Sequence, residues 1–188
     1  MMPVLPRRRG DRFRTVLTRL PALTALLLLV ALALATACGL EAGPREPYAN
    51  AFASKEAAAA AVVEAMAARD AERLAALTVT EVEFRKNIWP HLPASRPEVG
   101  MPFEYLWAET SAKSRGYLAQ VLQEHGGRRF EVRHVAFGGD VTDYGPFRIH
   151  PETRLTVVDE GGRSETLRLF GSMVEANGEW KLFSFVVD

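Results

Sequence analysis

The fold is decided by residues 163–187, RSETLRLFGSMVEANGEWKLFSFVV. Asn177-Gly178 is the strongest short signal for a β-hairpin, because both residues tolerate the positive φ angles of a tight turn. Apolar residues alternate on both sides of this turn, so we predict two long strands over residues 163–175 and 180–187. Gly161-Gly162 forms a second turn after a strand at residues 153–159. The three strands predict an antiparallel meander.

Towards the N-terminus, the spacing of apolar residues changes from every second residue, typical of strands, to every third or fourth, typical of helices. Residues 129–137 and 144–150 still alternate and predict two further strands. Residues 57–69 and 103–124 have helical spacing, and the second of these segments ends at Gly126-Gly127. Short helices are expected through Leu74 and Leu77, and after a capping box that begins at Thr80. Helices followed by antiparallel strands predict one α+β domain over residues 54–188.

The last two predicted strands carry apolar side chains in both alternation phases. An antiparallel sheet with one solvated face would be apolar on the other face only. We therefore expect Phe170, Phe183 and Phe185, which share one phase, to meet a second copy of the chain in a homodimer joined sheet to sheet. The alternatives are a ligand, or cover from the chain's own strands and loops. The two phases hold Leu167, Leu169, Met173, Trp180, Leu182 and Val186 in one, and Phe170, Val174, Phe183, Phe185 and Val187 in the other.

The charges of the chain are distributed unevenly. The formal net charge is zero, but six of the 23 basic residues and one of the 23 acidic residues lie within residues 1–37. The remainder is mildly acidic, and this argues against binding to nucleic acid, which needs clustered positive charge. The single cysteine excludes an internal disulfide and a cysteine-rich zinc site.

The N-terminal segment has the order of a secretory signal. Arginines between Arg7 and Arg19 precede an uncharged apolar run from Leu20 to Ala37. The run ends in Ala35-Thr36-Ala37-Cys38, which resembles the lipobox of bacterial lipoproteins. An uncleaved membrane anchor and ordinary signal cleavage are the alternatives.

The lipobox resemblance implies a processed, membrane-bound protein. Residues 1–37 would be a signal peptide, and Cys38 would become a diacylated N-terminus with fatty acyl chains such as palmitate. Two acyl chains suffice for stable anchoring. Residues 38–53 are rich in Gly and Pro and predict a flexible tether. The chain would then be an envelope protein. Gly39 after the cysteine resembles outer-membrane sorting, if the cell has an outer membrane.

The order of the elements, ending in Gly178-Glu-Trp-Lys-Leu182, resembles the nuclear-transport-factor-2-like superfamily. This superfamily includes ketosteroid isomerase and the polyketide cyclases. The resemblance covers residues 54–188 and matches no catalytic motif. It implies a cone of helices packed on a curved antiparallel sheet, with a pocket between the long helix and the concave face. Homodimers through the sheet are frequent in this superfamily.

Enzymes of this superfamily place an acid, a histidine or a tyrosine inside the cone. His134 shares an alternation phase with Phe130 and Val132, so we expect it on the inward face. It is the candidate catalytic residue, since histidine is the most frequent general acid–base group. The alternative is a core histidine that only packs.

The other pocket candidates are Trp89, His91, Trp107 and Tyr117. Trp89 and His91 lie between predicted helices, where a pocket mouth is expected, and Trp107 and Tyr117 lie on the apolar stripe of the long helix. For all four, side-chain packing is the alternative to ligand contact.

The other chemistries that we considered lack their motifs. There is no Gly-x-Ser-x-Gly elbow and no glycine-rich phosphate loop after a strand. The four histidines, at positions 91, 125, 134 and 150, have no metal-ligand spacing. We expect no metal and no cofactor.

Two functions remain from the sequence. The first is a non-catalytic module, lipid-anchored, that binds a small apolar ligand or an envelope protein. The second is an isomerase or lyase of small substrates that uses His134. An open cavity reached by His134 would favour the enzyme, whereas a cavity filled by Trp107 and Tyr117 would favour a scaffold.

Overall fold

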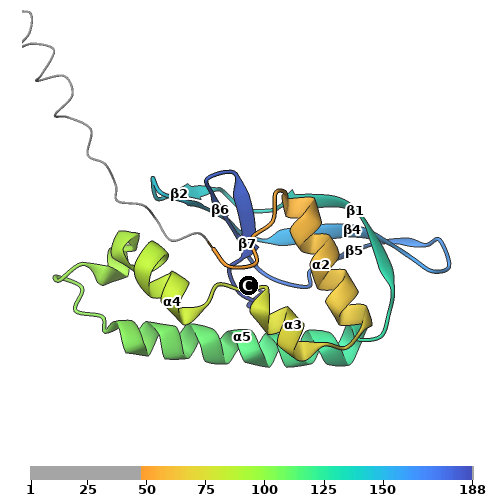
Figure 1. The fold of residues 1–188 in the computed structure, drawn as a ribbon, viewed down its shortest axis with the longest axis horizontal. Coiled ribbons are helices and arrows are strands. Elements are labelled where there is room, and N and C mark those ends of the chain that lie inside the picture. Colours follow the sequence, from red (N-terminus) through yellow and green to blue (C-terminus); the bar gives the residue numbers. More distant parts are fainter. Residues whose placement is uncertain (1–47, 188) are drawn as a thin grey trace, which may run out of the picture. The chain divides into compact units, whose positions relative to one another are not determined.

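The computed structural model describes residues 48–187, so the predicted signal peptide, Cys38 and the tether up to residue 47 lie outside the described residues. The described elements begin with helices and end with strands (Figure 1). The helical elements are α2 (Lys55–Ala67), α3 (Ala71–Ala76), α4 (Glu81–Glu83), a π-helical turn (Phe84–Ile88), two 3₁₀ turns (Trp89–His91 and Pro93–Ser95) and α5 (Phe103–His125). The strands are β1 (Phe130–Phe137), β2 (Thr142–Asp143), β3 (Arg148–His150), β4 (Thr153–Asp159), β5 (Ser164–Leu167), β6 (Met173–Ala176) and β7 (Glu179–Leu182).

The helices begin where the sequence places capping residues. The hydroxyl of Ser54 accepts a hydrogen bond from the N–H of Ala57 at the start of α2, and Asp70 caps α3 in the same way. Thr80 and Glu83 form the predicted capping box of α4. The buried side of α2 is mostly alanine and valine, so the helix packs closely on the strands beside it (Figure 1).

The strands form two antiparallel sheets, ordered β1-β4-β5 and β2-β3-β6-β7. The α+β class and the antiparallel pairing of the last strands are confirmed, since β4 pairs with β5 and β6 with β7. The prediction of one strand over residues 163–175 is wrong. Residues 168–172 leave the ladder and carry the chain from one sheet to the other.

Gly171 marks this crossing. The N–H of Thr153 donates to the Gly171 carbonyl across 2.7 Å, which joins the start of β4 to the crossing segment. A Cβ at Gly171 would lie 1.7 Å from the carbonyl oxygen of Val186, so no larger residue fits against the C-terminal segment. The chain therefore leaves the ladder at a place where the sequence predicted one straight strand.

The two alternation phases of β6 and β7 face two separate hydrophobic clusters. Met173 and Leu182 join the cluster that contains the buried side of α2. Val174 joins a second cluster, which contains Phe84 of the π-helical turn and Phe103 at the start of α5. Helices therefore cover both faces of this hairpin.

A dimer surface made of Phe170, Phe183 and Phe185 requires these side chains to be exposed in the single chain. The structure shows that they are not, so this prediction is wrong. Phe170 is 0% exposed and Phe185 is 1% exposed within one chain, and Phe183 is half-buried against the second cluster. The chain covers this apolar phase itself, which is the alternative that the sequence left open.

Residues 48–53, which the sequence assigned to the tether, are bound to the domain. Phe52 and Trp180 exchange two backbone hydrogen bonds, of 2.8 and 2.7 Å. The Ala49 N–H donates to Oε1 of Glu83 across 2.6 Å, and the Ala49 carbonyl accepts a hydrogen bond from Lys181. We call residues 48–53 the N-terminal strap.

Candidate functional site

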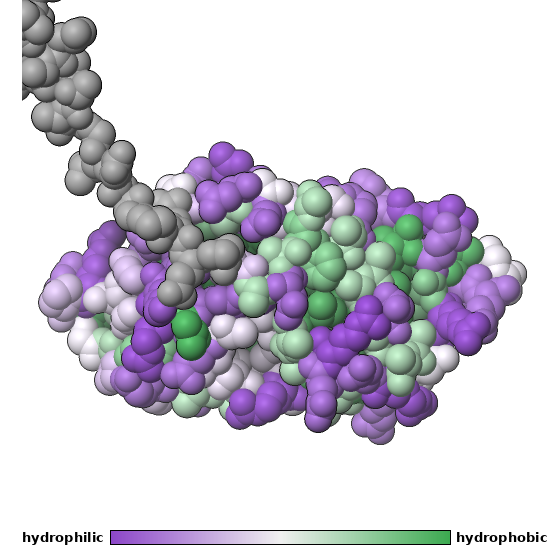
Figure 2. Space-filling model, viewed as in Figure 1, coloured by the Kyte–Doolittle hydropathy of each residue, from purple (hydrophilic) through white to green (hydrophobic). Residues whose placement is uncertain are grey.

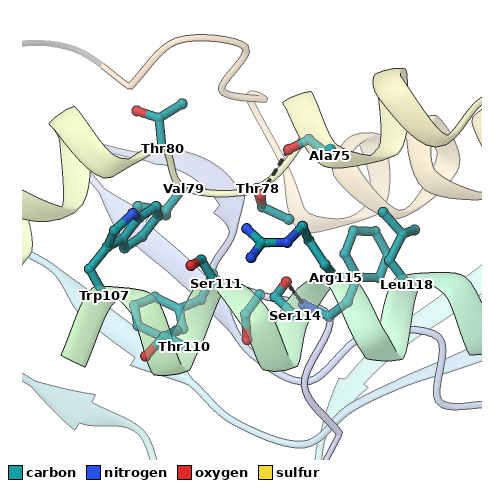
Figure 3. Close-up of a pocket in the computed structure, with 13 residues that line it drawn as sticks. Ala75, Thr78, Val79, Thr80, Trp107, Thr110, Ser111, Ser114, Arg115 and Leu118 are labelled. Atoms are coloured by element: carbon teal, nitrogen blue, oxygen red, sulfur yellow. Dashed lines mark hydrogen bonds between the residues drawn. The ribbon is translucent and has the colours of Figure 1, made fainter. Parts of the chain in front are cut away.

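A cavity of about 250 Å³ lies between α5, the end of α3 and the C-terminal segment (Figure 3). We call it the α5 cavity. Its lining is formed by Ala75, Thr78, Val79, Thr80, Trp107, Thr110, Ser111, Ser114, Arg115, Leu118, Phe183, Ser184 and Phe185. The volume falls just below the roughly 300–1,000 Å³ of pockets that hold drug-sized ligands, so the space suits a smaller molecule.

One face of α5 provides the longest wall of the cavity. Trp107, Ser111, Ser114 and Leu118 follow one another at intervals of three or four residues, which places them on the same side of the helix. Apolar side chains stand at both ends of this row and hydroxyls stand between them. The wall therefore offers apolar contact together with hydrogen bonding.

The hydroxyls are held in place to different degrees. Ser114 Oγ accepts a hydrogen bond of 3.0 Å from the N–H of Phe185, which fixes the C-terminal segment against α5. Thr78 Oγ1 donates to the Ala75 carbonyl across 2.8 Å, and Ser111 Oγ donates to Ala108 across 3.2 Å. Because Ser114 only accepts in this bond, its proton remains available to a ligand.

Arg115 supplies the charge of the cavity. Arg115 is an exposed residue of α5, and Figure 3 shows its guanidinium group among the side chains that line the cavity. Within residues 48–187 no carboxylate lies within ion-pair distance of Arg115, whereas Arg73 and Arg128 pair with carboxylates at 2.9 and 2.6 Å. Arg115 is thus a permanent cation whose donors are not taken up by an acidic neighbour.

The cavity contains one of the five residues that the sequence proposed for a pocket. Trp107 lines it. Tyr117 is half-buried against the main hydrophobic cluster, and Trp89 packs edge-on to Phe103 at 5.7 Å. His91 is exposed beside Phe147. The structure does not bring these three residues into the α5 cavity.

The prediction that His134 faces inward is wrong. β1 carries a bulge between Val132 and His134, where Val132 pairs with Val157 and His134 pairs with the next residue, Thr156. The extra residue, Arg133, reverses the alternation. Val135, at 0% exposure, takes the inward position and His134 is exposed.

The polar part of the cavity was not predicted. Thr110, Ser111, Ser114 and Arg115 were not proposed for a pocket. The available signal was the run of hydroxyl residues inside the helical stripe that Trp107 and Leu118 define. Such residues are neutral to unfavourable in a helix interior, so their clustering there suggests another role.

A buried histidine lies at the junction of the two sheets. His150 on β3 is 8% exposed, and its Nε2 lies 2.8 Å from Oε2 of Glu175. The rings of Phe137 and Trp180 each lie 4.7 Å from the imidazole, centroid to centroid. The cluster joins β1, β3, β6 and β7, and none of its side chains lines the α5 cavity.

A second hollow, of about 650 Å³, lies between α2 and β1. Figure 2 shows apolar residues gathered over α2, with charged residues around them. Ala57, Ala60, Val63 and Phe130 form its floor, and Glu56, Glu64, Arg129 and Glu131 also line it. It is an open groove without a convergent polar group.

The described residues show neither a metal site nor a membrane span. In residues 48–187 no three side chains among His, Cys, Asp and Glu converge as metal ligands. No helix of that same range has the length and apolar character needed to cross a bilayer.

Comparison of the chain with models of known families, with curated proteins and with solved structures finds no significant match.

Proposed function

We propose that this chain is an exported, lipid-anchored envelope protein whose domain binds a small, largely apolar ligand in the α5 cavity. The observation that carries the proposal is the lining itself. Val79, Trp107, Leu118, Phe183 and Phe185 give a mostly apolar wall, and a few hydroxyls and one guanidinium group converge on the same space. Ligand pockets have this composition.

The lining supports binding over acid–base catalysis. The described residues that line the cavity include no Asp, Glu, His, Cys, Lys or Tyr, the usual general acids and bases. The isomerase or lyase alternative depended on an inward His134, and the exposed position of this residue gives that alternative no support.

We also propose that the domain is a nuclear-transport-factor-2-like cone. Helices precede two antiparallel sheets, α5 packs against the C-terminal segment, and the chain crosses between the sheets at Gly171. This arrangement supports a nuclear-transport-factor-2-like cone, in which a ligand pocket beside the long helix is expected.

Export and anchoring rest on the sequence alone, on the lipobox-like Ala35-Thr36-Ala37-Cys38. The mature chain should begin at a diacylated Cys38 and partition with membranes. Intact-mass measurement of the membrane-extracted protein tests this expectation, with Cys38→Ala as the variant that should stay unprocessed. An N-terminus at Met1, or an unmodified Cys38, would contradict it.

Binding in the cavity is tested by photolabelling of the full chain in lipid nanodiscs. The probe is a neutral, short-chain alcohol that carries a diazirine, and mass spectrometry maps the labelled peptides. We expect saturable labelling of the α5 and C-terminal peptides that contain Trp107 and Phe183. Mapping by peptide separates the cavity from probe dissolved in the lipid.

Two variants fill the cavity from opposite walls. Thr110→Trp acts from α5 and Ala75→Phe from α3, and both should abolish labelling of the cavity peptides. Ala112→Trp and Ala76→Phe are matched controls on exposed positions outside the lining. Labelling that is absent in the wild type, or unchanged in both filled variants, would overturn the proposal.

A further inference from the structure

We infer that the ligand of the α5 cavity is a single-chain amphiphile with one carboxylate, and that Arg115 selects it by its charge. The inference rests on the proposed binding function and adds the chemical class of the ligand. The relevant features are the unpaired guanidinium group, the hydroxyls next to it, and the apolar wall.

The guanidinium group of Arg115 is available to an anion from outside. A guanidinium group offers a planar set of donors that matches a carboxylate. Several other arginines of the domain pair with its own acids, as Arg148 does with Asp143 across 3.2 Å and Arg154 with Glu152 across 3.1 Å. Arg115 has no such partner among the described residues, so an incoming carboxylate would have no competitor there.

The neighbouring residues add donors and no negative charge. Ser111 stands one turn before Arg115 on α5, and Thr110 and Ser114 line the same cavity. The thirteen lining residues of the described chain include no aspartate or glutamate. A carboxylate at the guanidinium group would therefore meet hydroxyl donors without repulsion from a lining acid.

The remainder of the lining determines the body of the ligand. Trp107, Phe183 and Phe185 are aromatic, and Val79 and Leu118 are aliphatic, so the space beyond Arg115 favours hydrocarbon. With about 250 Å³, the cavity suits one short chain or one ring. A molecule with a carboxylate at one end and a short apolar body satisfies both parts of the lining.

The test compares three diazirine probes with the same short chain and different end groups: a carboxylate, an alcohol and an ammonium group. Each is applied to the full chain in nanodiscs, and half-saturation of the cavity peptides is measured. We expect the carboxylate to half-saturate at a concentration about threefold below that of the alcohol, since an ion pair at an exposed site has a strength of that order. The ammonium probe should be the weakest.

Arg115→Gln removes the charge and keeps hydrogen bonding, so it should abolish the advantage of the carboxylate and leave labelling by the alcohol unchanged. Arg96→Gln is the matched control, because Arg96 is exposed and lies outside the lining. Added salt should weaken carboxylate labelling more than alcohol labelling.

The outcomes separate this inference from the proposed function. Loss of labelling by all three probes in the wild type would overturn the binding proposal and the inference together. Equal labelling by carboxylate and alcohol, or an advantage of the carboxylate that persists in Arg115→Gln, would overturn the inference alone.

Discussion

The ammonium group of Lys181 lies 3.0 Å from Oε1 of Glu83, although 98 residues separate them in the chain. The Lys181 side chain is 1% exposed and that of Glu83 is 8% exposed. The other carboxylate oxygen of Glu83 accepts the Thr80 N–H across 2.7 Å. One buried ion pair thus joins β7, the start of α4 and the N-terminal strap.

Lys181→Met should lower the free energy of unfolding by about 3 kcal/mol, because it leaves the carboxylate of Glu83 buried without its cation. Urea denaturation of the variant and the wild type measures this loss. Arg73→Met is the control, since it breaks an exposed ion pair with Glu64 and should change stability little. Equal losses in the two variants would show that burial of the Lys181 pair does not matter.

Glu83 should make the free energy of unfolding depend on pH in the acidic range. Burial opposes its ionisation, but hydrogen bonds from the Thr80 backbone and from Lys181 outweigh burial and hold the pKa of Glu83 below its ordinary value of 4.5. A carboxylate whose pKa is lowered by folding stabilises the fold above its unfolded pKa, and this stabilisation is lost as the pH falls through the folded pKa.

Glu83→Gln removes that titration. Below about pH 4.5 the free energy of unfolding should fall more steeply in the wild type than in Glu83→Gln. At neutral pH the variant has the lower free energy of unfolding. Urea denaturation at a series of pH values gives both profiles. Parallel profiles would mean that other acids, such as Asp143 and Asp159, account for the acid lability.

His134→Gln should leave the melting temperature unchanged, because the side chain is exposed after the bulge in β1. It should also leave labelling of the α5 cavity unchanged, since His134 does not line it. Thermal unfolding and photolabelling of the full chain check the two statements. A drop of several degrees in the melting temperature would argue that His134 is packed inside, as the simple alternation predicted.

Phe170→Ala should lower the free energy of unfolding by about 3–5 kcal/mol, the usual loss for a fully buried phenylalanine. Phe183→Ala should have a smaller effect, because Phe183 is half-buried and borders a cavity. Chemical denaturation of both variants compares them. If Phe170→Ala were neutral, its side chain would be exposed in solution, and the homodimer surface would regain support.

The elements that the sequence predicted correctly are those specified by a few neighbouring residues. The turn at Asn177-Gly178 has the positive φ angles that its residues favour, 54° and 79°. The long helix was predicted over residues 103–124 and spans Phe103–His125. Its apolar stripe and its terminal glycines are both readable from a few neighbouring residues.

The misplaced features depend on contacts between distant segments. The bulge at Arg133 inserts one residue into a regular alternation, and nothing in Arg133-His134 itself marks it. The break after Leu167 arises because Gly171 packs against the Val186 carbonyl, a contact that needs the C-terminal segment in place. Arg115 was overlooked because an exposed arginine on a helix is an ordinary surface residue, and its place beside the cavity depends on α3 and the C-terminal segment.

The N-terminal strap determines how the domain bears mechanical load. A pull transmitted along the chain from before Tyr48 reaches Ala49 and Phe52 first, and these residues are fastened to Glu83, Lys181 and Trp180. The backbone hydrogen bonds between Phe52 and Trp180 must break before the force reaches α2. Tension applied to the chain before residue 48 would therefore break hydrogen bonds at the edge of β7 before it reaches the helices.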